Sequence, residues 1–285
     1  MTKAPDTTND SLELWVARAK EGDRAALDHV VSTIQGDINR LAVRFLWHPA
    51  DAEDAAQEIL IRVITSLSSF RGDSRFRTWT YRVACNALLS MKHQRMESRA
   101  MSFDQFSDDL AQGLSEESEH APTAENAMLL EEVKVGCTLA MLLCLDREHR
   151  LAYILGEIME LDHNEAVAVL DIPTATYRKR LSRARAGIQS LMMSRCGLVN
   201  LANDCRCRKR VRVASSAGRI DPSHLLFASS REQAERFPMV IKEIRRLDEG
   251  RRAAALYRSH PNSDSSPALT AWLRHFLTQR PELLN

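Results

Sequence analysis

Apolar residues recur every three or four positions through most of this 285-residue chain, the spacing that places them on one face of a helix. No group of segments shows the strict two-residue alternation that half-buried strands require. The pattern therefore predicts an all-α fold. With 44% hydrophobic and 27% charged residues, the composition is that of a chain that builds folded cores, and the length suffices for two or three domains.

Two neighbouring segments near residue 170 carry the sequence signals of a helix-turn-helix. Asp162, with Glu165 three positions later, is expected to cap a helix that ends near Leu170. The "DIP" turn then leads through Pro173 into a second helix. On this second helix one apolar face is expected, made of Tyr177, Leu181, Ala184 and Ile188. This arrangement predicts a DNA-binding helix-turn-helix.

The second of these helices is strongly basic, and no Asp or Glu occurs between Asp171 and Asp204. Such a helix fits the major groove, with its first residues at base edges and its cations near phosphates. The alternative is a basic amphipathic helix that only keeps the chain soluble, but the capped helix and the turn before it favour DNA. The predicted DNA-binding residues are Thr174, Thr176, Arg178, Lys179, Arg180 and Arg183.

The stretch "FRGDSRFRTWTYR" at 70–82 combines four of the chain's sixteen aromatic residues with four arginines. Exposed aromatic rings beside a cationic track hold single-stranded nucleic acid, because only unpaired bases offer a face for stacking. The stretch therefore predicts a single-strand platform. The alternative is that Phe76, Trp79 and Tyr81 are core residues of a helical bundle.

A helix expected to begin at Asp51 has one apolar stripe and one polar face. The stripe is formed by Ala55, Ile59, Leu60, Val63 and Leu67. The polar face is expected to point outward, where it is available to a protein partner.

Charge is segregated along the chain, although the net charge is only +1. Between Arg99 and Lys134 there is no Lys or Arg, whereas nine acidic residues occur there. The segment 97–126 is therefore predicted to be a flexible acidic linker. Its acids either mimic nucleic acid or belong to a solvated tether.

Three of the six cysteines, Cys196, Cys205 and Cys207, lie within twelve residues beside basic segments. Cations lower the pKa of a thiol, so this group predicts zinc binding or oxidant sensing, with unremarkable thiols as the third alternative. The C-x8-C-x-C spacing lacks a fourth ligand unless His224 serves. The other cysteines are predicted to be small buried hydrophobes: Cys85, Cys137 and Cys144.

The N-terminal "MTKAPDTTND" has no apolar core of a signal peptide, and no stretch approaches the roughly 18 apolar residues that span a bilayer. We therefore expect a cytoplasmic chain without membrane contact. No phosphate-binding glycine loop, nucleophile elbow or HExxH motif occurs, so we do not expect an enzyme.

"DAEDAAQEILIRV", "FRGDSRFRTWTYRVACNALL", an acidic linker and "TYRKRLSRARAGI", in this order, resemble a bacterial RNA polymerase sigma factor. The chain is most similar to the extracytoplasmic-function group, which keeps only the second and fourth conserved regions. The implied organisation is a region 2 bundle at 10–96, the linker at 97–126, a region 4 helix-turn-helix at 127–194 and a mainly helical C-terminal extension at 195–285. This extension is expected to be regulatory.

The resemblance implies roles for individual residues and for partners. The partners are core RNA polymerase, promoter DNA as duplex and melted single strand, and in some members an anti-sigma factor; no cofactor is required. Residues implied in polymerase binding are Asp51, Asp54, Gln57, Glu58 and Arg62. Residues implied in recognising and melting the upstream-of-start element are Arg71, Phe76, Arg77, Trp79, Tyr81, Arg82, Asn86 and Lys92. The helix at 174–188 would read the minus-thirty-five element.

The alternative function is a stand-alone helix-turn-helix regulator, with the cysteine-bearing tail as a metal or redox sensor. Such a regulator has no use for a single-strand platform, so the aromatic–arginine stretch favours the sigma factor.

Overall fold

The computed structural model describes residues 7–91, 100–111, 124–261 and 267–279. Helices form nearly all regular structure in these ranges, beside two isolated β-bridges, and the all-α prediction is confirmed. The α-helices are α1 (Thr7–Lys20), α2 (Arg24–Leu46), α3 (Pro49–Thr65), α4 (Phe76–Ser90), α6 (Phe103–Ala111), α7 (Ala124–Leu142), α8 (Arg147–Tyr153), α9 (His163–Leu170), α10 (Thr174–Arg195), α11 (Cys207–Ser216), α12 (Arg231–Arg246), α13 (Glu249–Arg258) and α14 (Pro267–Gln279), with the short turns η1 (Leu67–Ser69) and η2 (Ile154–Ile158). None of the helices in the described ranges is long and apolar enough to cross a membrane.

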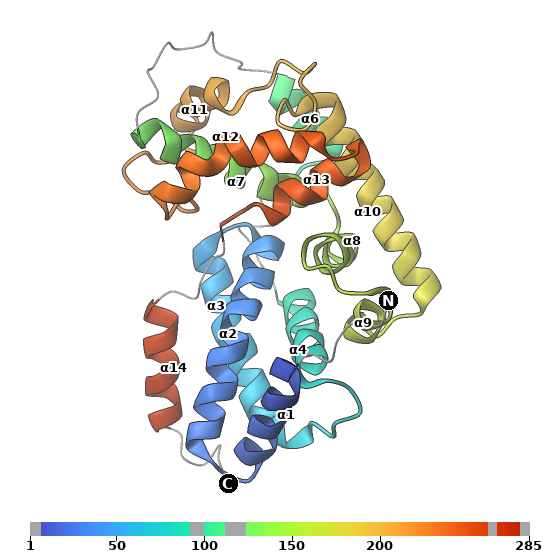
Figure 1. The fold of residues 1–285 in the computed structure, drawn as a ribbon, viewed down its shortest axis with the longest axis vertical. Coiled ribbons are helices and arrows are strands. Elements are labelled where there is room, and N and C mark those ends of the chain that lie inside the picture. Colours follow the sequence, from blue (N-terminus) through green and yellow to red (C-terminus); the bar gives the residue numbers. More distant parts are fainter. Residues whose placement is uncertain (1–6, 92–99, 112–123, 262–266, 280–285) are drawn as a thin grey trace.

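Helices α1 to α4 form a first bundle, with α2 packed between α1 and α3 (blue to cyan in Figure 1). Every residue of the predicted apolar stripe is buried, four of them on α3 and Leu67 in η1, so the polar face of α3 must point outward. The first backbone amide of α4 finds its hydrogen-bond acceptor in another helix, because Glu13 Oε1 in α1 accepts the Phe76 amide at 2.7 Å. This contact replaces the missing side-chain cap at Arg75 and anchors α1 against α4.

Helices α8 to α10 pack together with η2 as a second bundle, and α10 runs along its edge (yellow in Figure 1). The C-terminal extension is mainly helical, as predicted, and α11 and α12 pack on α7 while α13 packs on α10 and η2. The last helix, α14, returns to the first bundle beside α3, where Gln35 Nε2 donates to Thr270 Oγ1 at 3.3 Å. The extension thus contacts both bundles.

The prediction of a flexible linker across 97–126 was wrong for the part that forms α6. Ser102 Oγ accepts the Gln105 amide at 3.1 Å and Gln105 Oε1 accepts the Ser102 amide at 2.9 Å, a reciprocal cap that starts the helix. Phe106 and Leu110 are buried against the rest of the protein. Because burying these two side chains stabilises α6 by about 1.5–3 kcal/mol each, the helix is held in place despite its acidic surroundings.

Three arginines join the two bundles by donating to backbone carbonyls at the ends of helices. Arg82 of α4 donates to the Ala168 carbonyl in the last turn of α9, at 2.9 Å from Nε and 2.6 Å from Nη2. Arg147 of α8 donates to the carbonyls that end α4, Leu88 at 2.8 Å and Met91 at 2.6 Å. A cation at a helix C-terminus satisfies unpaired carbonyls and the negative end of the helix dipole. The third, Arg150, ties α8 to the ends of α2 and α7.

Candidate nucleic-acid and protein-binding surfaces

The helix-turn-helix predicted at 162–188 is present as α9, a tight turn and α10. Asp162 caps α9, accepting the amides of Asn164 and Glu165 at 2.9 Å each. The turn is made at Asp171, whose φ of 52° is left-handed, and Pro173 precedes the first residue of α10. The apolar face predicted on α10 is buried throughout, since Tyr177, Leu181, Ala184 and Ile188 all lie in the core.

The basic residues of α10 divide into two sets with different surroundings. Arg180 forms an ion pair with Glu148 of α8, and Arg185 Nε donates to Glu157 Oε1 of η2 at 3.1 Å. Arg178, Lys179 and Arg183 are exposed and have no ion pair within the described part of the chain.

The remaining predicted residues on α10 lie at its start. Thr174 is exposed and Thr176 is half-buried. The outward surface of α10 therefore includes threonine side chains near its N-terminus and, further along the helix, three cations that form no ion pair with other described residues.

The single-strand platform is only partly available, because two of its rings are in the core. Phe76 is 0% exposed and Tyr81 is 3% exposed, so the prediction that they stack on bases was wrong in this arrangement. The reason is that the inward face of α4 carries both rings, and burial raises the pKa of the Tyr81 hydroxyl to about 12. Trp79 is half-buried and packs against Phe70 and Phe76, with ring centroids 5.5 Å apart in both pairs.

The polar residues of the same segment are more accessible. Arg71, Arg77 and Asn86 are exposed, and Arg77 forms an ion pair with Asp37 of α2. Arg82 is half-buried and held by the Ala168 carbonyl of α9. Lys92 lies outside the described residues.

The polar face of α3 points outward. Asp54, Glu58 and Arg62 are exposed, and Glu58 pairs with Arg62 one turn later. Asp51 and Gln57 are half-buried at the edge of the same face. The helix begins at Pro49, two residues before the expected start, because the His48 side chain caps it by accepting the Ala50 amide at 3.3 Å. The face presents a short acidic surface to solvent.

Cys196 is buried, and Cys205 and Cys207 are half-buried, which reverses their predicted acidity. Burial raises the pKa of Cys196 to about 11, and it also raises the pKa values of Cys205 and Cys207. The prediction of thiolates stabilised by neighbouring cations was therefore wrong. His224 is exposed, and among the described residues no three His, Cys, Asp or Glu side chains, as they lie, form a group that could hold a metal ion.

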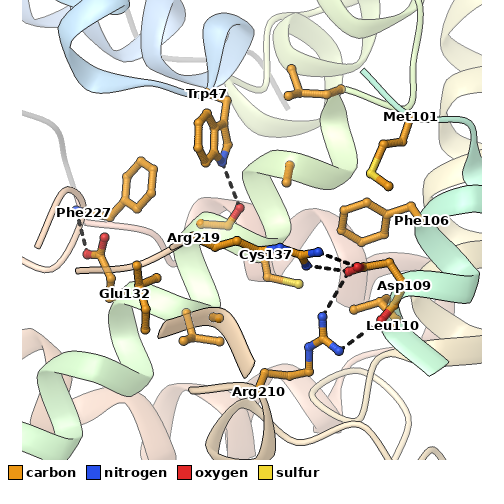
Figure 2. Close-up of a pocket in the computed structure, with 16 residues that line it drawn as sticks. Trp47, Met101, Phe106, Asp109, Leu110, Glu132, Cys137, Arg210, Arg219 and Phe227 are labelled. Carbon is orange, nitrogen blue, oxygen red and sulfur yellow. Dashed lines mark hydrogen bonds and ion pairs between the residues drawn. The ribbon is translucent and has the colours of Figure 1, made fainter. Parts of the chain in front are cut away.

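A pocket of about 290 Å³ lies where the extension meets α6, α7 and the end of α2 (Figure 2). Trp47 reaches into it from the end of α2 and donates its indole N–H to the Gly136 carbonyl of α7 at 3.1 Å. On the opposite wall Asp109 of α6 binds Arg210 at 3.0 Å and Arg219 at 2.5 Å. The Arg219 hydrogen bonds hold the pKa of the Asp109 carboxyl below its ordinary value. These contacts fasten α6 to the extension.

Comparisons with known proteins agree with this architecture. The family Sigma-70 region 2 matches residues 30–97. The RNA polymerase sigma-H factor of Pseudomonas aeruginosa is 32% identical over 191 residues, which are 65% of this chain and 95% of that protein. The ECF RNA polymerase sigma-E factor of Escherichia coli K12 is 31% identical over 182 residues, 62% of this chain and 92% of that protein.

Among solved structures, that of CnrH in complex with the cytosolic domain of CnrY covers 63% of this chain and 95% of that chain, at 22% identity and a TM-score of 0.43. This likeness is too distant to bear on function.

A helical chain with a sigma region 2 bundle belongs to a class of transcription initiation factors. The chain belongs to the extracytoplasmic-function group of bacterial RNA polymerase sigma factors. Proteins of this family act in transcription initiation and are not enzymes, and membership implies core RNA polymerase and promoter DNA as partners. The matches leave about a third of this chain outside the alignment with either relative, since they cover 65% and 62% of it.

Proposed function

We propose that α10 reads the upstream promoter element in the major groove, α4 holds the melted strand, and the outer face of α3 binds core polymerase. The observation that supports this division most strongly is the sorting of charges on α10. Arg178, Lys179 and Arg183 are exposed without ion-pair partners among the described residues, while Arg180 and Arg185 hold the helix to its own bundle. Phosphates and base edges are the natural partners of such a cationic helix face.

For α4 we infer a smaller single-strand site than the sequence predicts. Arg71, Arg77, Asn86 and the exposed part of Trp79 would contact the strand, and the buried rings would hold Trp79 in position from below. Arg82 would join this site only after it releases the Ala168 carbonyl, because one guanidinium cannot cap α9 and bind DNA with the same N–H groups. Promoter melting by α4 would therefore be coupled to the separation of α4 from α9.

For α3 we infer that the acidic outer face docks on core RNA polymerase, in the cytoplasm where that enzyme works. Replacing Asp54 and Glu58 together by lysine should weaken binding to core polymerase about tenfold or more, a loss of roughly 1.4 kcal/mol, because the surface potential changes sign. Co-elution and a fluorescence titration with core polymerase of the same bacterium would measure this loss.

The matched control is Asp28→Lys, an exposed acid on α2 of the same bundle. It changes a surface charge without touching α3 and should leave polymerase affinity near the wild-type value. Equal affinity of the Asp54/Glu58 variant and wild type would show that polymerase docks elsewhere. An anti-sigma factor as a further partner stays a prediction.

We further propose that the extension restrains polymerase binding through α14. This helix lies beside α3, with Leu269 and Leu273 buried, so a protein that approaches the outer face of α3 meets α14. Leu273→Glu should detach α14. If α14 blocks the face in half of the molecules, detachment strengthens apparent polymerase affinity about twofold, because affinity scales with the fraction that is competent to bind.

The same titration measures this effect, with Met239→Glu as control because Met239 is an exposed apolar residue of α12. Unchanged polymerase affinity of the Leu273→Glu chain, with α14 shown to be detached by protease sensitivity near residue 270, would exclude the restraint.

A further inference from the structure

The structure brings a fourth cysteine to the three in the tail. Cys137 of α7, Cys196 at the end of α10, Cys205 and Cys207 all line one cavity of about 20 Å³. A space of this size holds one water-sized particle or one ion. Cys137 is separated from Cys196 by 59 positions of sequence, so the local spacing gave no sign that it would supply the missing member of the group.

The chain between two of these cysteines is built to hold them together. Cys196 and Cys205 face each other in a parallel β-bridge, which closes the intervening loop. Gly197 permits this approach, because a Cβ atom there would collide with the Cys205 carbonyl oxygen. Asn203 Nδ2 donates to the Met193 carbonyl at 3.0 Å and to the Cys196 carbonyl at 3.3 Å. The backbone thus places both cysteines independently of their side chains.

Backbone amides lie close to two of the sulfur atoms. The amides of Leu198 and Val199 lie near the Cys196 sulfur and the Gly197 amide lies near the Cys205 sulfur, where they oppose the rise in pKa that burial causes. The Val199 amide also donates to the Cys196 carbonyl oxygen at 3.3 Å. A neutral thiol is a weak acceptor that needs no such donors, whereas a thiolate is stabilised by them. The loop is therefore suited to sulfur in its anionic form.

The surroundings also supply compensating charge. Cys207 is within electrostatic reach of the other three thiols and of Lys134, and Cys205 is within reach of Arg206, Lys209 and Arg210. As isolated groups these thiols stay protonated, because burial raises their pKa values. A bound divalent cation deprotonates coordinating thiols outright, and the neighbouring cations then offset the remaining negative charge.

We propose that Cys137, Cys196, Cys205 and Cys207 together bind one Zn²⁺ ion as four thiolate ligands. The side chains as they lie do not form a group that could hold a metal ion among the described residues, so binding requires the thiols to turn toward the cavity. Each cysteine has a single χ1 bond with three staggered positions, and rotation about it leaves the backbone in place. The ion would connect the end of α10 to α7 and to the start of α11, as a tetrahedral structural site. Each bound thiol would release its proton to solvent.

The experiment is metal analysis of the full-length chain purified with a reductant and without chelator. We expect about one zinc per chain, as for a closed four-cysteine site. Single serine variants of the four cysteines should each lose most of the bound zinc. Cys144→Ser is the matched control, because Cys144 does not line this cavity, and it should retain the wild-type zinc content.

Titration of the metal-free, full-length wild-type chain with Co²⁺ keeps the proposal testable if serine variants fail to fold. The sulfur-to-cobalt charge-transfer absorbance should rise to the intensity of four thiolates and saturate at about one ion per chain. Zinc content near zero after incubation with zinc and dialysis would overturn the proposal. So would full zinc retention by Cys137→Ser.

Discussion

Replacing Arg178 and Lys179 together by alanine is expected to weaken binding of the polymerase complex to duplex promoter DNA about 100-fold. Both side chains are exposed on the outer face of α10 and have no ion-pair partner among the described residues. A lost contact to a base edge or phosphate costs about 1.4 kcal/mol, and two such losses multiply to about 100-fold. Fluorescence anisotropy on a promoter fragment, found by mapping start sites on genomic DNA, would measure the change.

A salt titration distinguishes phosphate from base contacts, because the slope of log affinity against log salt falls by about one for each phosphate contact removed. The matched control is Arg231→Ala with Arg236→Ala, which removes the same charge from α12. Those arginines pair with Glu235 and Glu232 of their own helix and are 69% exposed, so their loss should barely change DNA affinity. Equal weakening in both double variants would mean that only net charge matters and that α10 is no specific reader.

Replacing Arg150 by methionine is expected to lower the free energy of unfolding by about 3 kcal/mol or more, because each buried acceptor left without a donor costs about 1–3 kcal/mol. Arg150 is 2% exposed, and it donates to the carbonyls of Phe45 and Leu142 at 2.9 Å and Leu145 at 2.8 Å. Burial lowers its pKa to about 10, so it stays charged at neutral pH. Methionine fills similar space but offers no N–H group to the ends of α2 and α7.

Urea unfolding followed by circular dichroism would measure this loss. Arg150→Lys keeps the charge but not the planar set of donors. Its free energy of unfolding should lie between that of Arg150→Met and that of the wild type. Arg75→Met is the surface control. Its free energy of unfolding should stay within about 0.5 kcal/mol of the wild-type value, because Arg75 is exposed. A loss below about 1 kcal/mol for Arg150→Met would show that solvent satisfies these carbonyls and that Arg150 does not hold the bundles together.

The elements that sequence predicted well are those whose signals are local. The Asp162 cap, the turn before Pro173 and the apolar face of α10 depend on residues within a few positions of one another, and all are present. The same kind of signal marked α6, where Ser102 and Gln105 form a reciprocal cap. This capping signal did not lead us to predict a helix, because the nine acidic residues in the surrounding segment favoured a flexible linker.

The errors arose where exposure depends on packing between distant segments. Phe76 and Tyr81 have the residue types of a stacking platform, but α4 turns both rings into the hydrophobic core. Composition cannot distinguish a ring that faces solvent from one that faces the core, since both satisfy the same helical period. The acidity of the tail thiols was misjudged for the same reason, because their burial outweighs the nearby cations.

The amino-acid sequence by itself determined the helical class and the helix-turn-helix, because periodicity, caps and turns act over short distances along the chain. Only the tertiary structure decided which cations of α10 face outward, that Arg82 is held by α9, and that Cys137 meets Cys196, Cys205 and Cys207. Each of these features is a contact between helices far apart in sequence. Such contacts follow from how the buried faces of the helices pack together, and the residues beside them along the chain carry no record of that packing.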